Sequence, residues 1–127
     1  MDEYNLWEPS EDIPYGDLYF LGIKDDSSEL TISLGILGSE RTLEVKFSAV
    51  LGYRITQESA RLRSLGESVS LNRFRTSLSS DFLNWFKEES LNLFDELELT
   101  HYVICNTDNI IDVITGNPVT TKWIDLR

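Results

Sequence analysis

Hydrophobic and polar residues alternate with a period of two over three segments in the first half of the chain. These segments are 18–20, 30–36 and 43–49. Successive side chains of a β-strand point to opposite faces, so each segment would bury one face and expose the other. The polar runs 24–28 and 38–40 are typical of turns, and such short connections make neighbouring strands antiparallel. The pattern therefore predicts an antiparallel meander.

In the second half of the chain the hydrophobic period changes to that of a helix. Phe82, Trp85, Phe86 and Glu89 are spaced i, i+3, i+4 and i+7, which places them on one face of a helix. The residues 79–81 (Ser-Ser-Asp) supply an N-cap and an acidic first turn. We predict one amphipathic helix over about 80–90 that packs this face against the sheet.

The remaining segments carry shorter patterns. They predict a strand over 50–56 with a kink at Gly52, one or two helical turns over 57–63, a loop over 66–70, a short strand over 71–75, a hairpin of 101–106 and 110–114, and a last edge strand over 119–126. The order is thus strands, one helix and strands again. This order is typical of an α+β fold, with a mostly antiparallel β-sheet (meander plus C-terminal hairpin) packed against one main amphipathic helix.

The chain has 127 residues, which suits a single domain over 1–127. Residues 1–15 are acidic and contain Pro9 and Pro14. They predict an irregular acidic N-terminal arm, held to the rest of the domain by Trp7 and Tyr15.

Charge narrows the classes of function. The chain has 22 acidic and 11 basic residues, a formal net charge of −11. Nucleic-acid binding depends on Lys and Arg neutralising phosphates, and docking on anionic lipid also needs basic residues, so we expect neither partner. A large negative charge favours a basic protein partner.

The start of the chain and its cysteine content suggest a compartment. Residues 1–5 are polar and acidic, without the apolar stretch of a signal peptide, and Cys105 is the single cysteine. No apolar run approaches the roughly 20 residues that span a bilayer. We therefore expect a cytoplasmic protein in a reducing setting.

Few residues could carry covalent chemistry. His101 and Cys105 would lie on one face of a strand but about 13 Å apart, which is too far for a nucleophile–base pair. We expect Cys105 to fill the core and His101 to be structural, and only a pairing across the hairpin would form a dyad of His101 with Asp112. One Cys and one His also argue against a zinc site, since structural zinc sites use four Cys or His ligands. The sequence thus predicts no catalytic residue, no metal site and no cofactor.

The charges are unevenly distributed. Residues 1–29 hold nine acids and one base, residues 81–98 hold six acids and one base, and residues 41–75 hold seven bases and three acids. For the arginines at 54, 61, 63, 73 and 75 we favour internal pairing, for example with Glu58, over a patch that binds an anion or RNA. The acids form the candidate binding surface. The candidate partner-binding residues are Asp25, Asp26, Glu29, Glu88, Glu89, Asp95, Glu96 and Glu98.

Four segments, 43–59, 80–90, 101–104 and 111–113, carry a family resemblance. In this order they resemble small acidic bacterial proteins of unknown function, some of which look like immunity proteins of toxin systems, including contact-dependent growth inhibition. The resemblance implies a cytoplasmic, non-enzymatic protein that binds the C-terminal domain of one cognate toxin, commonly a basic nuclease. The acids would occupy the cationic groove of that toxin.

Two other functions stay open. A small-ligand module or an enzyme would have a pocket between sheet and helix, using His101, Glu58 and the arginines. A structural subunit of a larger assembly would expose apolar edge strands.

Overall fold

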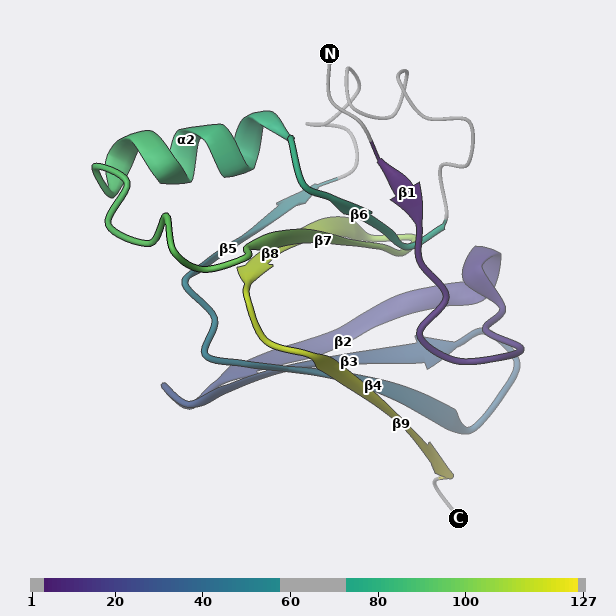
Figure 1. Ribbon diagram of the computed structural model, residues 1–127. Helices are drawn as coiled ribbons and strands as arrows, with labels where there is room; N and C mark the ends of the chain where they lie inside the picture. Colours follow the sequence, from purple (N-terminus) through teal and green to yellow (C-terminus); the bar gives the residue numbers. More distant parts are fainter. Residues whose placement is uncertain (1–3, 58–72, 126–127) are drawn as a thin grey trace.

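The computed structural model describes residues 4–57 and 73–125. Within these ranges the chain forms nine β-strands, one α-helix and one 3-10 helix (Figure 1). The elements are β1 (Asn5–Leu6), η1 (Tyr15–Asp17), β2 (Leu18–Asp25), β3 (Glu29–Ile36), β4 (Arg41–Ser48), β5 (Gly52–Gln57), β6 (Arg75–Ser77), α2 (Asp81–Glu89), β7 (Thr100–Cys105), β8 (Asn109–Thr115) and β9 (Val119–Asp125). Helical turns were predicted over 57–63, but Gln57 is instead the last residue of β5. The rest of that segment, the loop at 66–70 and residues 71–72 of the predicted strand lie outside the described residues.

The strands of the described residues form two antiparallel sheets, not one. One sheet has the order β1-β6-β7-β8-β5, and the other has the order β2-β3-β4-β9. The two sheets face each other, and α2 covers the outer face of the first sheet (Figure 1). The predicted α+β class, with antiparallel strands against one helix, is confirmed. The division arises because β5 pairs with β8 and not with its sequence neighbour β4, and β9 in turn pairs with β4 and not with β8.

The predicted meander is β2-β3-β4, and its register aligns the apolar positions. Leu30 lies opposite Phe47, and Ile32 lies opposite Val45. All four side chains are buried, and polar residues occupy the alternate positions. Burying each large apolar side chain stabilises the fold by about 1.5–3 kcal/mol. Period two therefore persists here because one face of this sheet packs on the core and the other meets solvent.

Strand β8 is buried along its whole length. Ile111 and Val113 belong to the core between the two sheets, whereas Ile114 packs with α2. The strand lies in the middle of three layers, so both of its faces are covered. This explains why its apolar run shows no alternation.

Helix α2 confirms the predicted helix and its cap. The hydroxyl of Ser80 accepts a hydrogen bond from the backbone N–H of Leu83 at 3.2 Å, and Phe82, Leu83 and Phe86 are buried. Trp85 was expected in the same buried stripe, but that prediction is wrong, since its side chain is 54% exposed. Its ring stacks on Phe82 instead, at a centroid distance of 5.7 Å.

The N-terminal arm is more ordered than predicted. Asn5 and Leu6 pair with Thr76 and Arg75 as a short edge strand, so the prediction of an irregular arm is wrong at these two residues. The predicted anchoring is confirmed. The Trp7 ring lies 5.0 Å from that of Tyr102, and the Tyr15 ring lies 5.0 Å from that of Phe74.

Candidate functional site

The first group of candidate acids forms the β2–β3 turn. One carboxylate oxygen of Asp26 accepts hydrogen bonds from the Glu29 N–H at 2.8 Å and from the N–H and hydroxyl of Ser28, both at 3.1 Å. The bond from Glu29, followed by those from Ser28, lowers the pKa of Asp26. Asp25 accepts from the Ser27 N–H at 3.1 Å. These two carboxylates therefore shape the turn, and the Glu29 carboxylate lies 3.8 Å from the ammonium of Lys46.

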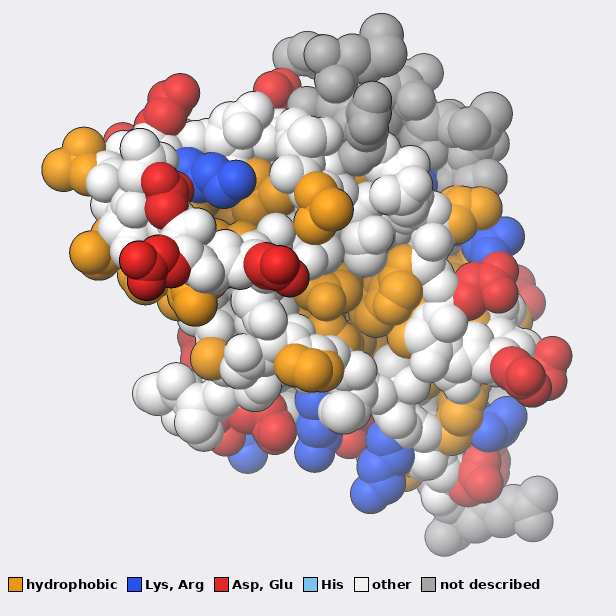
Figure 2. All heavy atoms as spheres, in the orientation of Figure 1, with side chains coloured by type: hydrophobic (Ala, Val, Ile, Leu, Met, Phe, Trp, Pro, Cys, Tyr) orange, Lys and Arg blue, Asp and Glu red, His pale blue; other side chains and the backbone are white. Residues whose placement is uncertain are grey.

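The second group of candidate acids surrounds the end of α2. We call residues 88–98 the acidic–leucine segment, because its exposed acids alternate with exposed leucines. Its exposed acids are Glu88, Glu89, Asp95, Glu96 and Glu98. Leu91 is 88% exposed, Leu93 76% and Leu97 53%. Figure 2 shows acidic and hydrophobic side chains gathered over the end of α2 and the loop that follows.

The backbone explains why these leucines project into solvent. Beyond α2 the N–H of Leu91 bonds to the carbonyl of Glu88, and the N–H of Asn92 bonds to the carbonyl of Lys87. This pair of bonds is the Schellman motif, in which the first residue after the C-cap has a left-handed conformation and is usually glycine. Here that residue is Leu91, with φ of 52°. A left-handed leucine costs about 1–2 kcal/mol, and its exposed side chain gains no packing in return.

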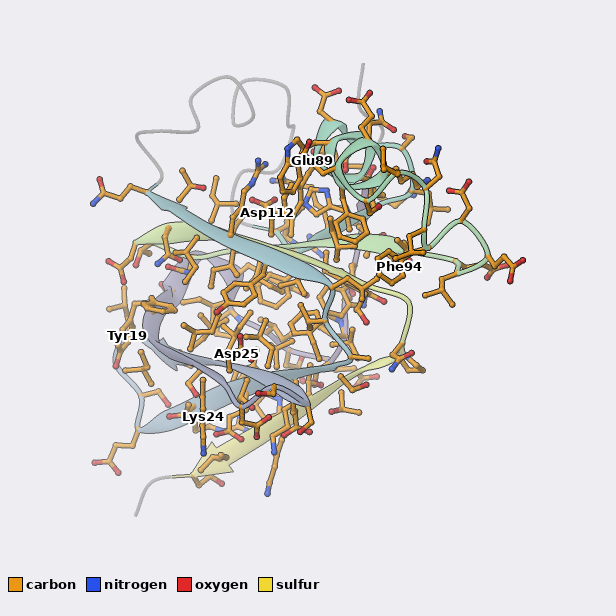
Figure 3. The ribbon with its side chains drawn as sticks, turned by 90° about the vertical axis from the view of Figure 1, so that its left-hand side faces the viewer. Tyr19, Lys24, Asp25, Glu89, Phe94 and Asp112 are labelled. Carbon is orange, nitrogen blue, oxygen red and sulfur yellow. The ribbon has the colours of Figure 1, made fainter. Side chains whose placement is uncertain are left out.

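The two acidic groups lie on either side of one short link, Val50 to Tyr53. On one side, Asp25 and this link line a cavity of about 240 Å³. On the other side, Leu51 packs against the cluster that contains Phe86 of α2. Figure 3 views this end of the molecule, with Asp25 below and Glu89 and Phe94 above. The structure thus brings both predicted acidic groups to one end of the sandwich.

The possible dyad of His101 and Asp112 does form, across the β7–β8 hairpin. Nε2 of His101 lies 2.6 Å from a carboxylate oxygen of Asp112, and Nδ1 lies 2.7 Å from the hydroxyl of Ser80. The other Asp112 oxygen accepts from Nε of Arg54 at 2.9 Å. The hairpin pattern allows a pairing of His101 with Asp112, whereas residues 79–81 predict only a helix cap and not the contact of Ser80 with His101.

These contacts form a consistent chain when His101 is neutral. The Leu83 N–H donates to Ser80, the Ser80 hydroxyl donates to Nδ1 of His101, and the Nε2–H of His101 donates to Asp112. Serine, histidine and aspartate are the groups of a nucleophilic triad. Ser80, His101 and Asp112 are, however, all fully buried at 0% exposure, and the hydroxyl already caps α2. In this structure the chain of bonds fastens the helix to the sheet.

Cys105 and the arginines also have defined surroundings. Cys105 is buried with Val103 and Ile110, as expected of a core residue. Arg54 pairs with Asp112, and Arg73 pairs with Glu8. Internal pairing is confirmed for these two arginines, whereas Arg61, Arg63 and Glu58 lie outside the described residues.

Neither a metal-binding group nor a membrane span is found in the part of the chain that the structure describes. No three His, Cys, Asp or Glu side chains of residues 4–57 and 73–125 are grouped to hold an ion. No described helix is both long and apolar enough to cross a bilayer. A scan against protein-family models finds no match, and searches of curated proteins and of solved structures find no significant match.

Proposed function

We propose that this protein binds a cationic protein through the end of the sandwich that carries the acidic–leucine segment. The partner class we favour, from the resemblance of its sequence to immunity proteins, is a cognate bacterial toxin domain with a basic nuclease surface. Binding would take place in the cytoplasm and would cover the active site of the toxin. The protein would act by occupying this surface, without making or breaking covalent bonds.

One observation carries the proposal: Leu91 is left-handed and 88% exposed. At this position glycine would remove the backbone strain, and a polar residue would suit the solvent. A leucine that satisfies neither demand is explained if it packs against another molecule. Leu93 and Leu97 of the same segment are exposed as well, so three apolar side chains would enter the interface together.

Charge and apolar contact would have separate roles. The exposed acids at 88, 89, 95, 96 and 98 create a negative field that attracts a cationic surface and accelerates association. The leucines become desolvated on contact and hold the complex together, because removing apolar surface from water is favourable. Asp25 at the neighbouring turn extends the negative surface.

The test is binding to the purified product of the neighbouring reading frame, measured by calorimetry. We expect Leu91→Gly to weaken binding about tenfold, the loss typical of one anchoring side chain. The same change should stabilise the free protein by about 0.5–1 kcal/mol, since the relief of left-handed strain exceeds the added entropy of an unfolded glycine. Opposite effects on stability and on binding would be difficult to produce by general damage to the fold.

The matched control is Leu37→Ser. Leu37 is also exposed, but it follows β3 at the opposite end of that strand from the β2–β3 turn. Charge reversal at Glu88 and Glu89 should slow association at low salt, whereas reversal at Glu40, beyond Leu37, should not. The proposal is wrong if Leu91→Gly binds as tightly as the unaltered protein, or if Leu37→Ser weakens binding equally.

A further inference from the structure

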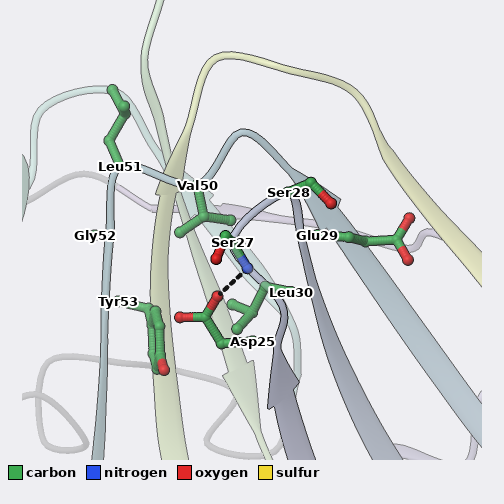
Figure 4. Close-up of a pocket in the computed structure, with 9 residues that line it drawn as sticks. All are labelled: Asp25, Ser27, Ser28, Glu29, Leu30, Val50, Leu51, Gly52 and Tyr53. Atoms are coloured by element: carbon green, nitrogen blue, oxygen red, sulfur yellow. Dashed lines mark hydrogen bonds between the residues drawn. The ribbon is translucent and has the colours of Figure 1, made fainter.

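A cavity of about 240 Å³ opens between the β2–β3 turn and the link from β4 to β5 (Figure 4). The half-buried Val50 side chain supplies an apolar wall, the exposed ring of Tyr53 forms one side, and the Asp25 carboxylate stands at the turn. The cavity therefore combines a hydrocarbon surface, an aromatic ring and a negative charge.

The carboxylate of Asp25 is oriented by its own turn. One oxygen accepts the hydrogen bond from the Ser27 N–H at 3.1 Å, and in Figure 4 the other oxygen lies on the side of Tyr53. The Glu29 side chain extends away from this space in Figure 4 and lies 3.8 Å from Lys46. The negative charge facing the cavity thus comes from Asp25.

We propose that this cavity receives an arginine side chain of the protein partner. A guanidinium group is planar, stacks on aromatic faces and pairs with a carboxylate, so it matches Tyr53 and Asp25 together. The methylene groups of the arginine would pack on Val50. At about 30 Å³ per water molecule, the cavity has the volume of about eight waters, which is enough for the seven heavy atoms of this side chain. A lysine ammonium is more strongly hydrated and cannot stack as a plane, so arginine is the preferred occupant.

This inference rests on the proposed function only for the source of the arginine, and the cavity can be tested without any partner. The probe is N-acetyl-L-arginine amide, titrated into the ¹⁵N-labelled full-length chain. We expect saturable shifts of the amide signals of Ser27, Leu51 and Tyr53, with a Kd on the order of 10 mM, as one ion pair and one cation–π contact allow. The corresponding citrulline amide, which is neutral, and the lysine amide should bind at least about threefold more weakly.

The chain offers a closely matched pair of variants for this titration. Asp25→Asn keeps an oxygen for the Ser27 N–H but removes the charge at the cavity, so arginine binding should fall about fivefold. Asp26→Asn removes the same charge from the same turn, but Asp26 does not line the cavity, so binding should stay within about twofold. Tyr53→Leu should also weaken the binding of the arginine probe but affect the lysine probe less.

Two results would overturn the inference. One is the absence of saturable shifts up to about 100 mM probe, tenfold above the expected Kd. The other is equal loss of arginine binding in Asp25→Asn and Asp26→Asn. The fate of the proposed function is read separately, from the binding of Leu91→Gly to the toxin domain. If the arginine probe does not bind but Leu91→Gly weakens binding to the toxin domain, only the arginine site is rejected. If the arginine probe binds but Leu91→Gly leaves toxin binding unchanged, the leucine interface is rejected.

Discussion

Replacing Asp112 by asparagine should strongly destabilise the fold. The Asp112 side chain is fully buried and accepts hydrogen bonds from His101 at 2.6 Å and from Arg54 at 2.9 Å. Its two oxygens thus face two N–H donors from different strands. An asparagine side chain offers one oxygen and one NH₂ group, so one of these donors would face another donor.

The histidine ring could change its tautomer, but this moves the defect without removing it. Nε2 of His101 would then accept from the new amide, and Nδ1–H would donate to Ser80, which already accepts from the Leu83 N–H. The Ser80 hydroxyl proton would lose its partner in a fully buried site. An unsatisfied buried donor costs about 1–3 kcal/mol, and the lost charge-assisted bonds cost a similar amount. We therefore expect Asp112→Asn to lower the free energy of unfolding by about 3–5 kcal/mol, the usual result of breaking a buried pair.

The assay is equilibrium unfolding in urea, followed by the fluorescence of the three tryptophans. The m-value should stay unchanged while the midpoint falls, because the surface exposed on unfolding is the same. The matched control is Asp125→Asn. Asp125 also accepts from an arginine Nε, that of Arg41 at 3.1 Å, but its side chain is 69% exposed, so its loss should cost less than about 1 kcal/mol.

A second measurement tests whether the network is connected. If the altered tautomer leaves the Ser80 hydroxyl without a partner, Ser80→Ala removes that defect in the Asp112→Asn background. The double variant should then be less destabilised than the sum of the single variants, by about 1 kcal/mol. If the effects of Asp112→Asn and Ser80→Ala on the free energy of unfolding simply add, the link through His101 is refuted. If Asp112→Asn destabilises the fold no more than Asp125→Asn does, the argument from burial is refuted.

Three further predictions concern the turn, the helix cap and one glycine. A Cβ at Gly35 would lie 2.2 Å from the ring of Tyr19, whereas a Cβ at Gly22 would have nothing within 4 Å. Gly35→Ala should therefore cost about 1–2 kcal/mol in urea unfolding, and Gly22→Ala should be neutral or stabilising by up to about 1 kcal/mol; equal effects would contradict the contact with Tyr19. Ser80→Ala alone should cost about 1–2 kcal/mol and lower the helical signal of circular dichroism, since α2 loses its cap; an unchanged midpoint would show that the cap contributes nothing. Hydrogen bonds from Glu29 and Ser28 lower the pKa of Asp26 from 3.8, so the ionised carboxylate stabilises the fold above pH 3.8 and this contribution disappears as the pH falls through the lower folded-state pKa. The melting temperatures of the wild type and of Asp26→Asn should thus converge on acidification, and a constant difference down to about pH 2 would argue against the turn bonds.

Local periodicity was sufficient to predict the elements that have one solvent-exposed face and one buried face. The alternation at 30–36 and 43–49 became β3 and β4, and the helical spacing after Ser80 became α2 with the expected cap. In such elements the pattern of apolar and polar side chains over a few neighbouring residues already indicates which face is buried. The negative charge of the chain and the positions of its acidic runs were likewise readable without a structure.

Long-range pairing decided the rest. No local pattern predicts that β5 joins β8 or that β9 joins β4, and these two pairings place the strands in two sheets. The same packing buried both faces of β8 and joined Ser80, His101 and Asp112, which come from three separate elements. It also brought the β2–β3 turn and the acidic–leucine segment to either side of the Val50–Tyr53 link. The sequence determined which segments could bury a face, and the tertiary structure determined what covered each face, because those contacts join residues far apart in the chain.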